Sequence, residues 1–233
     1  MQQQLIQIPE RPPGNPKLFD EDTIRVEFLK CSDDDWGQAY FIHNYIKIYD
    51  NETRTWIPFN LWPAKVETIL AMTMHRFMVI LKTRQVGISW LCTAFILWNA
   101  LFRPEILGLL FSKREAEAID LLVYRVKGMY RALPDWMKSK EIKADSRFEF
   151  ALSNGSRIKA SSAGGSDSYS ATHVLIDEAD IIHESGRKLY DLLVDVEPTV
   201  GSAKWWLILA SRSDKTRPNS TFKNIFNRFN GFH

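Results

Sequence analysis

Short apolar runs alternate with longer segments of helical spacing along most of the chain, from about Leu61 onward. Apolar residues three or four positions apart predict helices, and apolar runs of strand length predict buried strands. In chain order, the predicted elements are helix 63–74, strand 77–81, helix 87–101, strand 106–111, helix 113–131, strands 148–152 and 157–160, and strands 173–176 and 205–209. Because a Ser-Asn-Gly-Ser turn sequence separates strands 148–152 and 157–160, these two are expected to form a hairpin.

Strands that alternate with helices in this order indicate βαβ units, and therefore an α/β domain with a mainly parallel sheet. Such sheets bind ligands beyond the carboxyl ends of their strands. The first sixty residues follow a less regular pattern, and residues 8–16 are rich in proline, which predicts an extended arm. The sequence thus divides into an N-terminal arm and flanking segment, residues 1–60, and an α/β core, residues 61–233.

The composition is that of a folded protein without a secretory or membrane-spanning segment. The 233 residues are 45% hydrophobic and 12% aromatic, which is enough for one sizeable core. The N-terminus lacks a basic region followed by an apolar one, and no apolar stretch reaches the length of a membrane span. Cys31 and Cys92 lack zinc-binding spacing, so a soluble intracellular protein is expected. The net charge of +2 confines any nucleic-acid contact to a local patch.

A candidate phosphate-binding loop joins predicted strand 77–81 to predicted helix 87–101. Its residues are Lys82, Thr83, Arg84, Gln85, Val86, Gly87, Ile88 and Ser89. Gly87 lets backbone N–H groups converge on phosphate oxygens, and Ser89 stands where the hydroxyl of a P-loop holds magnesium. The usual lysine position is taken by Ile88, but Lys82 can reach the phosphates from the start of the loop because its stem is long and flexible. Arg84 can bridge phosphate oxygens, although an ordinary basic turn between strand and helix would have the same composition.

The strand predicted at 173–176 delivers two adjacent carboxylates, Asp177 and Glu178, to its carboxyl end. This is the Walker B pattern, in which the first acid holds magnesium and the second polarises the attacking water. Asp177 is therefore the predicted magnesium ligand and Glu178 the predicted general base. An Asp-Glu pair can also cap a following helix, but the phosphate loop upstream favours the catalytic interpretation.

A third polar segment, Ser211-Arg212-Ser213, follows the strand predicted at 205–209. Small hydroxyls at this place in P-loop motors can sense the terminal phosphate, and a polar turn after a core strand is equally consistent with the residues. The surrounding cations could contact a phosphate backbone, although a solvated helix face is the simpler explanation. These cations are Lys204, Arg212, Lys215, Arg217, Lys223 and Arg228.

Together and in this order, the motifs resemble the large terminase subunits of tailed double-stranded DNA bacteriophages. The resemblance covers about Leu61 to Phe226. It rests on Leu61-Trp62-Pro63, on K-T-R-Q-V-G-I-S as a deviant Walker A loop, on V-L-I-D-E-A-D as Walker B, and on L-I-L-A-S-R-S as a coupling motif. It implies a P-loop NTPase of the additional-strand type that uses ATP and Mg²⁺.

The resemblance also implies residue roles and partners. By position, the implied roles are ATP binding by residues 82–89, catalysis by Glu178, Asp177 and Arg84, magnesium binding by Ser89 and Asp177, and coupling by Ser211, Arg212 and Ser213. The implied activity is an ATPase motor for viral genome packaging, which translocates double-stranded DNA into a procapsid. Its implied partners are the DNA, the portal protein, the small terminase subunit and further copies of the chain in a ring, with an isolated chain as a possible monomer. The implied location is the cytoplasm of the infected bacterial host, with no membrane contact.

Three departures from the family pattern limit these assignments. Lys65 stands where many members carry a glutamine that reads adenine, which leaves base selectivity open. The Arg-Gly pair that supplies an arginine finger in many members is missing from the corresponding stretch, 167–171, and Arg157 or Arg212 could replace it. The nuclease domain that follows the motor in the family is also missing, so DNA cleavage is not expected.

Two other functions fit parts of the sequence. Asp-Glu-Ala-Asp at 177–180 also occurs in superfamily 2 helicases, but those pair it with a Gly-Lys-Thr loop and a second motor domain, and this sequence has neither. Alternatively, Ile88 could mark a degenerate loop in a nucleotide-binding scaffold without turnover. Substitution of Glu178 distinguishes the enzyme from the scaffold, because only the enzyme would lose hydrolysis.

Overall fold

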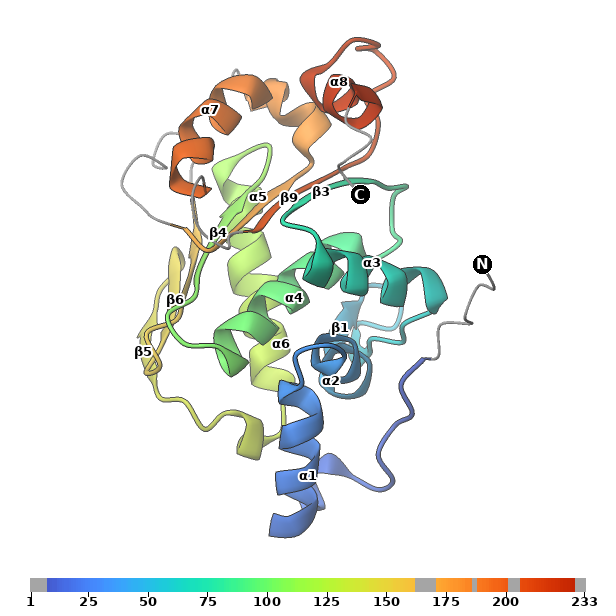
Figure 1. The fold of residues 1–233 in the computed structure, drawn as a ribbon, viewed down its shortest axis with the longest axis vertical. Helices are drawn as coiled ribbons and strands as arrows, with labels where there is room; N and C mark the ends of the chain where they lie inside the picture. Colours follow the sequence, from blue (N-terminus) through green and yellow to red (C-terminus); the bar gives the residue numbers. More distant parts are fainter. Residues whose placement is uncertain (1–7, 162–170, 186–187, 201–205, 229–233) are drawn as a thin grey trace.

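The computed structural model describes residues 8–161, 171–185, 188–200 and 206–228, and its centre is a seven-stranded sheet (Figure 1). In spatial order, the strands are β3 Phe77–Leu81, β9 Trp206–Ser211, β8 His173–Asp177, β4 Leu107–Phe111, β7 Arg157–Ala160, β6 Glu149–Leu152 and β5 Ile142–Asp145. The first five pair in parallel, and β6 and β5 continue the sheet with antiparallel pairing. The predicted α/β class, mainly parallel sheet and β6–β7 hairpin are confirmed.

The parallel strands are covered on both faces, which explains their nearly continuous apolar sequences. In β4, Leu110 belongs to one core cluster and Leu109 to the other. In β8, Leu175 belongs to the first cluster, and Val174 and Ile176 belong to the second. The two clusters therefore follow the period-two alternation of side chains along a strand.

The first face carries α3 Pro63–Met74 and α4 Ile88–Phe102. Pro63 is the first residue of α3, a position where a missing N–H costs no intrahelical hydrogen bond. The middle and end of α4 are buried on all sides, so this apolar helix is a central core element. A Cβ at Gly108 would lie only 2.7 Å from Ile96 Cγ2, which shows how closely α4 packs on β4.

The charged segment predicted as one helix over 113–131 is helical, but it is not a uniform α-helix. It consists of α5 Glu115–Asp120, the π-helical turn η2 Leu121–Val126 and α6 Lys127–Ala132. The wider turn is closed by a hydrogen bond from Lys127 N to Leu122 O. Leu121, Leu122 and Val126 are all buried in this turn. A spacing of three or four residues cannot reveal the extra residue, and the prediction of a continuous regular helix is wrong there.

The N-terminal part contains regular elements that the sequence pattern did not reveal. They are η1 Pro16–Leu18, α1 Glu21–Ser32, α2 Gly37–Tyr45, and the hairpin of β1 Lys47–Asp50 with β2 Thr55–Pro58. Phe41 and Ile42 of α2 lie in the same core cluster as α4. The indole Nε1 of Trp98 in α4 donates a buried hydrogen bond of 2.7 Å to the carbonyl of Cys31. These contacts join α1 and α2 to the sheet domain.

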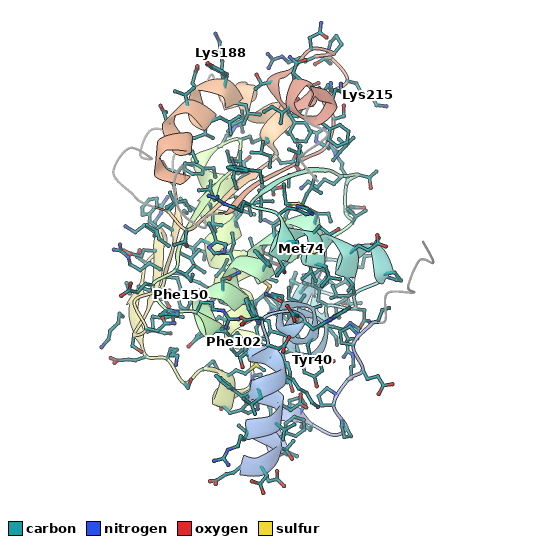
Figure 2. All side chains as sticks on the ribbon, viewed as in Figure 1. Tyr40, Met74, Phe102, Phe150, Lys188 and Lys215 are labelled. Atoms are coloured by element: carbon teal, nitrogen blue, oxygen red, sulfur yellow. The ribbon has the colours of Figure 1, made fainter. Side chains whose placement is uncertain are left out.

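The second face of the sheet is covered by η4 Ala179–Ser185, α7 Leu189–Val200 and α8 Thr221–Arg228 (Figure 1). A further short turn, η3 Asp135–Met137, follows α6 in the chain. Leu192 of α7 and Phe222 of α8 are buried in the second core cluster. Lys188 and Lys215 extend outward at this end of the molecule (Figure 2). Among the described residues, the structure contains no helix that combines the length and apolarity needed to cross a membrane.

Candidate functional site

The polar segments singled out in the sequence meet at one edge of the sheet. β3, β9 and β8 are neighbours and run parallel, so their carboxyl ends lie together. The register pairs Leu81 with Ser211 and Asp177 with Ala210. The backbone N–H of Lys82 then donates a 2.8 Å hydrogen bond to the carbonyl of Ser211. The loop after β3, the acids after β8 and the polar segment after β9 are therefore adjacent.

Lys82 is the central cation of this edge. Its Nζ donates to Ser89 Oγ at 2.9 Å and to Asp177 Oδ1 at 2.8 Å, and lies 3.5 Å from Glu178 Oε1. The Lys82 side chain is only 8% exposed. Burial of an ammonium is tolerable here because two carboxylates and a hydroxyl replace the lost water. The lysine at the start of the loop thus contacts the serine of its own loop and both acids after β8.

Two residues of the loop have left-handed backbone angles of the kind that occur in anion-binding turns. Gln85 and Gly87 have φ values of 64° and 80°, in the left-handed region that glycine adopts most readily. Such residues turn backbone N–H groups toward a common side, and the N-terminus of α4 at Ile88 adds positive potential there. Among the loop side chains, Thr83, Arg84 and Gln85 are exposed, while Val86 and Ile88 are half-buried.

Arg84 is not part of the contact network around Lys82. Its side chain is exposed and makes no hydrogen bond or ion pair with any residue that the structure describes. Its predicted role on the phosphates therefore stays a prediction.

Glu178 holds its carboxylate next to the lysine in a strained backbone conformation. Its φ is 55°, in the left-handed region that residues with a side chain adopt infrequently. Glu178 Oε2 lies 3.6 Å from Arg212 Nε, an ion pair at the partly exposed rim of the site. The same oxygen is enclosed, yet it accepts no hydrogen bond from the described residues. A carboxylate oxygen in this state can accept a hydrogen bond from water.

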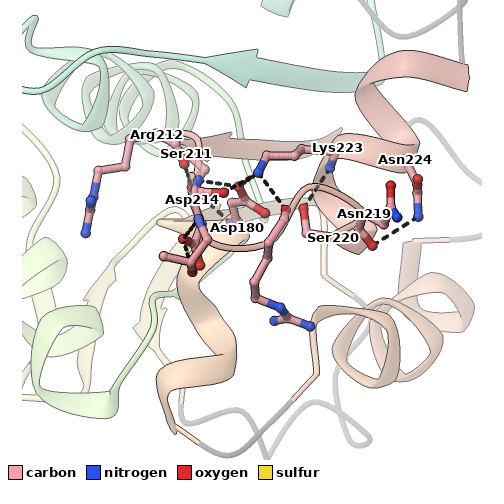
Figure 3. A network of polar contacts seen from close by, with 10 residues as sticks. Asp180, Ser211, Arg212, Asp214, Asn219, Ser220, Lys223 and Asn224 are labelled. Carbon is pink, nitrogen blue, oxygen red and sulfur yellow. Dashed lines mark hydrogen bonds and ion pairs between the residues drawn. The ribbon is translucent and has the colours of Figure 1, made fainter.

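The segment after β9 is hydrogen-bonded to the end of β8 (Figure 3). Ser211 Oγ accepts a 2.9 Å hydrogen bond from the backbone N–H of Asp180 and donates one of 2.9 Å to the carbonyl of Arg212. Asp180 Oδ2 accepts from the N–H of Asp214 at 2.6 Å and lies 3.7 Å from Lys223 Nζ. These contacts connect the end of β8 to the loop before α8.

Comparison with protein families identifies the core of the chain. Residues 79–189 match the family model described as the N-terminal part of the T4-like virus type of terminase large subunit. This stretch, slightly less than half of the chain, is similar to the large terminase family. The match contains residues 82–89 and the acids Asp177 and Glu178, and its family is the one that the sequence motifs resemble. No curated protein matches the chain.

Solved structures show the same fold. The ATPase domain of the large terminase from Thermus phage P74-26 has a TM-score of 0.55 at 17% identity, with 68% of this chain and 67% of that chain covered. A single-residue mutant of that domain gives a TM-score of 0.54 at 18% identity, with 68% of each chain covered. The HK97 bacteriophage large terminase gives 0.57 at 16% identity, with 73% of this chain and 36% of that chain covered. The likeness to these terminases supports the additional-strand arrangement, in which β9 lies between β3 and β8.

The oxygen atoms beside Lys82 fit a magnesium ion. Ser89 Oγ and Asp177 Oδ1 both lie within hydrogen-bonding distance of Lys82 Nζ, so the two oxygens already converge on one cation. The part of the chain that the structure describes contains no group of three or more His, Cys, Asp or Glu residues arranged around a metal. Magnesium commonly binds through one or two carboxylates together with water and phosphate oxygens, which agrees with this sparse donor set.

Lys65 contributes a second buried cation that sequence reasoning treated only as a departure from the family. Its Nζ lies 3.7 Å from the centre of the Trp62 ring and 4.4 Å from that of Phe59. A Cβ at Gly87 would be 3.4 Å from this Nζ, so Lys65 borders the phosphate loop. Burial lowers the pKa of Lys65 to about 8. Neighbouring aromatic residues in the sequence were the signal for this cation–π arrangement.

The other cations predicted to act as an arginine finger or to contact DNA lie in different surroundings. Arg157 lies at the amino end of β7, 3.8 Å from Glu149, so this suggested finger stands at the opposite end of the parallel strands from Asp177. Lys223 of the basic patch is only 18% exposed and donates to the carbonyls of Asp214 and Arg217. Lys204, the Arg228 side chain and residues 167–170 lie outside the described residues.

Proposed function

We propose that the chain is the ATPase motor domain of a viral large terminase, which hydrolyses ATP to translocate double-stranded DNA into a procapsid. The observation that carries the proposal is the convergence of Lys82, Ser89 and Asp177 between a phosphate-loop backbone and the Walker B strand end. A fold and family match over the same stretch supports it. The further proposed partners are the portal protein, the small terminase subunit and other copies of the chain in a ring. The proposed location is the cytoplasm of the bacterial host.

In this proposal, the loop of residues 82–89 binds the triphosphate with the backbone N–H groups that follow Lys82 and with the ammonium of Lys82. Lys82 now contacts Ser89 and Asp177, whose oxygens are the proposed magnesium ligands. Lys82 must therefore release them when nucleotide binds, and its flexible stem then places the ammonium on phosphate oxygens. Magnesium, when bound, would neutralise charge that develops on the β- and γ-phosphates. Arg84 at the exposed rim supplies a further cation for phosphate oxygens.

Glu178 is the proposed general base. It orients and polarises the attacking water through the carboxylate oxygen that accepts no hydrogen bond from the described residues. Loss of the terminal phosphate changes the charge beside Glu178 and Lys82. The hydrogen bond from Asp180 to Ser211 then conveys the change from β8 to the segment 211–213 after β9. This connection is the proposed coupling between hydrolysis and movement of DNA.

Steady-state phosphate release from magnesium-ATP tests the enzymatic part of the proposal. Glu178→Gln is expected to reduce kcat on the order of a thousandfold and to retain ATP binding, because it removes only the base. Glu141→Gln is the matched control, since Glu141 is 69% exposed in a surface pair with Lys143 and should leave turnover unchanged. Binding without turnover by the unaltered chain, or turnover that Glu178→Gln leaves intact, would refute the assigned chemistry. Strand separation in place of duplex translocation would indicate a helicase.

A further inference from the structure

Arg125 lies at an irregular point of the fold that faces the proposed nucleotide site. It belongs to the π-helical turn η2, between α5 and α6. Such turns contain an extra residue and change the direction in which the following side chains point. π-Helical turns are also frequent at functional sites.

The Arg125 guanidinium is held by an aromatic ring rather than by an acid. Its carbon Cζ lies 5.5 Å from the centre of the Trp90 ring, and Trp90 directly follows Ser89 of the phosphate loop. Trp56 and Tyr124 pack on the same indole, with ring centres 5.8 and 6.0 Å away. The arginine is thus fixed beside the first turn of α4, where the loop ends.

The guanidinium N–H groups of Arg125 donate no hydrogen bond to the described residues. Its Nε is buried, and Arg125 makes no hydrogen bond or ion pair with the described residues. Burial lowers the pKa of Arg125, while the charges of Asp177, Asp120 and Glu178 act in the opposite direction. The Walker B acids therefore lie within electrostatic reach of the guanidinium without contacting it. Arg125 as a whole is half-buried, and leaving its buried Nε–H unpaired is unfavourable.

We propose that Arg125 is the arginine with which this chain itself recognises the terminal phosphate of a bound nucleoside triphosphate. The inference rests on the proposed function, because it needs the triphosphate to lie between Lys82, Ser89 and Glu178. The guanidinium leaves the face of Trp90 and donates two hydrogen bonds to the terminal phosphate, a geometry that suits its planar fork. A nucleoside diphosphate lacks this group, so Arg125 remains on Trp90.

The other arginines near the site are less suited to this role. Arg84 is exposed, and Arg212 is already 3.6 Å from Glu178 in an ion pair. Arg157 is paired with Glu149 at the opposite end of the strands. Among these residues, Arg125 combines a buried Nε without a hydrogen-bond partner with electrostatic proximity to the Walker B acids.

The test compares affinities for a non-hydrolysable ATP analogue and for ADP, measured by calorimetry with magnesium on the full chain. Arg125→Gln is expected to weaken binding of the analogue about tenfold or more, and to leave ADP binding unchanged. It should also lower kcat on the order of a thousandfold, as the loss of an arginine at the terminal phosphate does elsewhere. Arg131→Gln is the matched control because Arg131 is exposed on the adjoining α6 and should change neither affinity.

Arg125→Lys covers the case in which the glutamine variant fails to fold, because a lysine keeps the charge and the contact with Trp90. It too should lose preference for the triphosphate, since an ammonium cannot bind bidentately. If the unaltered chain binds and hydrolyses ATP but a folded Arg125 variant keeps the original preference and turnover, the inference is wrong and the proposed function stands. If the unaltered chain binds neither nucleotide, both are wrong.

Discussion

Lys82 Nζ lies 2.8 Å from Asp177 Oδ1, although the two residues are 95 positions apart in the sequence. The contact joins the first residue of the phosphate loop to the last residue of the Walker B strand. Parallel pairing of β3 with β9 and of β9 with β8 places both residues at the same sheet edge. The pair therefore has a structural role in the free chain and, in the proposed function, a chemical role when ATP binds.

Lys82→Ala is expected to destabilise the chain and to weaken ATP binding. It leaves the Asp177 carboxylate, whose side chain is 6% exposed, without its cation. Loss of one partner from a buried pair lowers the free energy of unfolding by about 3 kcal/mol. Lys143→Ala is the control because Lys143 is 56% exposed in its pair with Glu141, and it should cost less than about 1 kcal/mol. Urea unfolding at neutral pH measures both, and equal effects would contradict the assigned importance of the Lys82 pair.

The left-handed backbone at Glu178 predicts that this residue lowers the stability of the chain while its carboxylate is needed for hydrolysis. Glu178→Gly and Glu178→Ala both remove the carboxylate and should both abolish hydrolysis. Only glycine relieves the strain of a φ of 55°, so Glu178→Gly should be more stable than Glu178→Ala by about 1 kcal/mol. Thermal unfolding of the two variants measures the difference. An alanine variant as stable as the glycine variant would show that this conformation is not strained.

Lys65 predicts a dependence of stability on pH. Its pKa is about 8 in the folded chain, below the ordinary value of 10.5. As pH rises, Lys65 therefore loses its proton in the folded state before it does so in the unfolded state. The buried charge of Lys65 destabilises the fold in full below about pH 8, and this effect disappears as pH rises toward 10.5. Lys65→Met should raise the free energy of unfolding at pH 7 by about 1 kcal/mol and flatten its dependence between these pH values.

Urea unfolding as a function of pH measures this effect, and Lys47→Met is the control because Lys47 is exposed at the start of β1. The Lys65 assignment fails if both variants retain the same rise in stability with pH.

The hydrogen bond from Asp180 N to Ser211 Oγ predicts a further loss of stability. Ser211 is fully buried, so Ser211→Ala leaves the Asp180 N–H without its acceptor. The free energy of unfolding should fall by about 1 to 2 kcal/mol. Ser213→Ala, two residues later and exposed, should have no measurable effect in the same denaturation experiment. Comparable losses for the two serines would remove Ser211 from the proposed coupling network.

Much of the sheet was predictable because its strands are short apolar runs bounded by polar loops. The position of Lys82 was predictable for the same reason, since it follows β3 directly. β5 was not predicted: Ile142–Asp145 contains one strongly apolar residue, and its pairing with β6 comes from tertiary structure. α1 was missed because its apolar residues are interrupted by charges, and buried Glu27 is held by Tyr40 and Tyr45, which lie elsewhere in the sequence.

The chemistry was less predictable where it depends on distant packing. Sequence motifs identify Asp177 and Glu178, but not the aromatic environment of Lys65 or the unused donors of Arg125. Lys223 was grouped with cations for DNA, yet it binds carbonyls and faces Asp180 after the chain folds. Charge counts along a sequence cannot separate a cation that faces solvent from one that holds a loop.

The most direct test of the central claim is a structure of the chain with magnesium and a non-hydrolysable ATP analogue. In the predicted complex, Lys82 Nζ leaves Ser89 and Asp177 and contacts oxygens of the β- or γ-phosphate, while Ser89 and Asp177 face the metal. A bound analogue with Lys82 still hydrogen-bonded to Asp177, or with phosphates away from residues 82–89, would contradict this prediction.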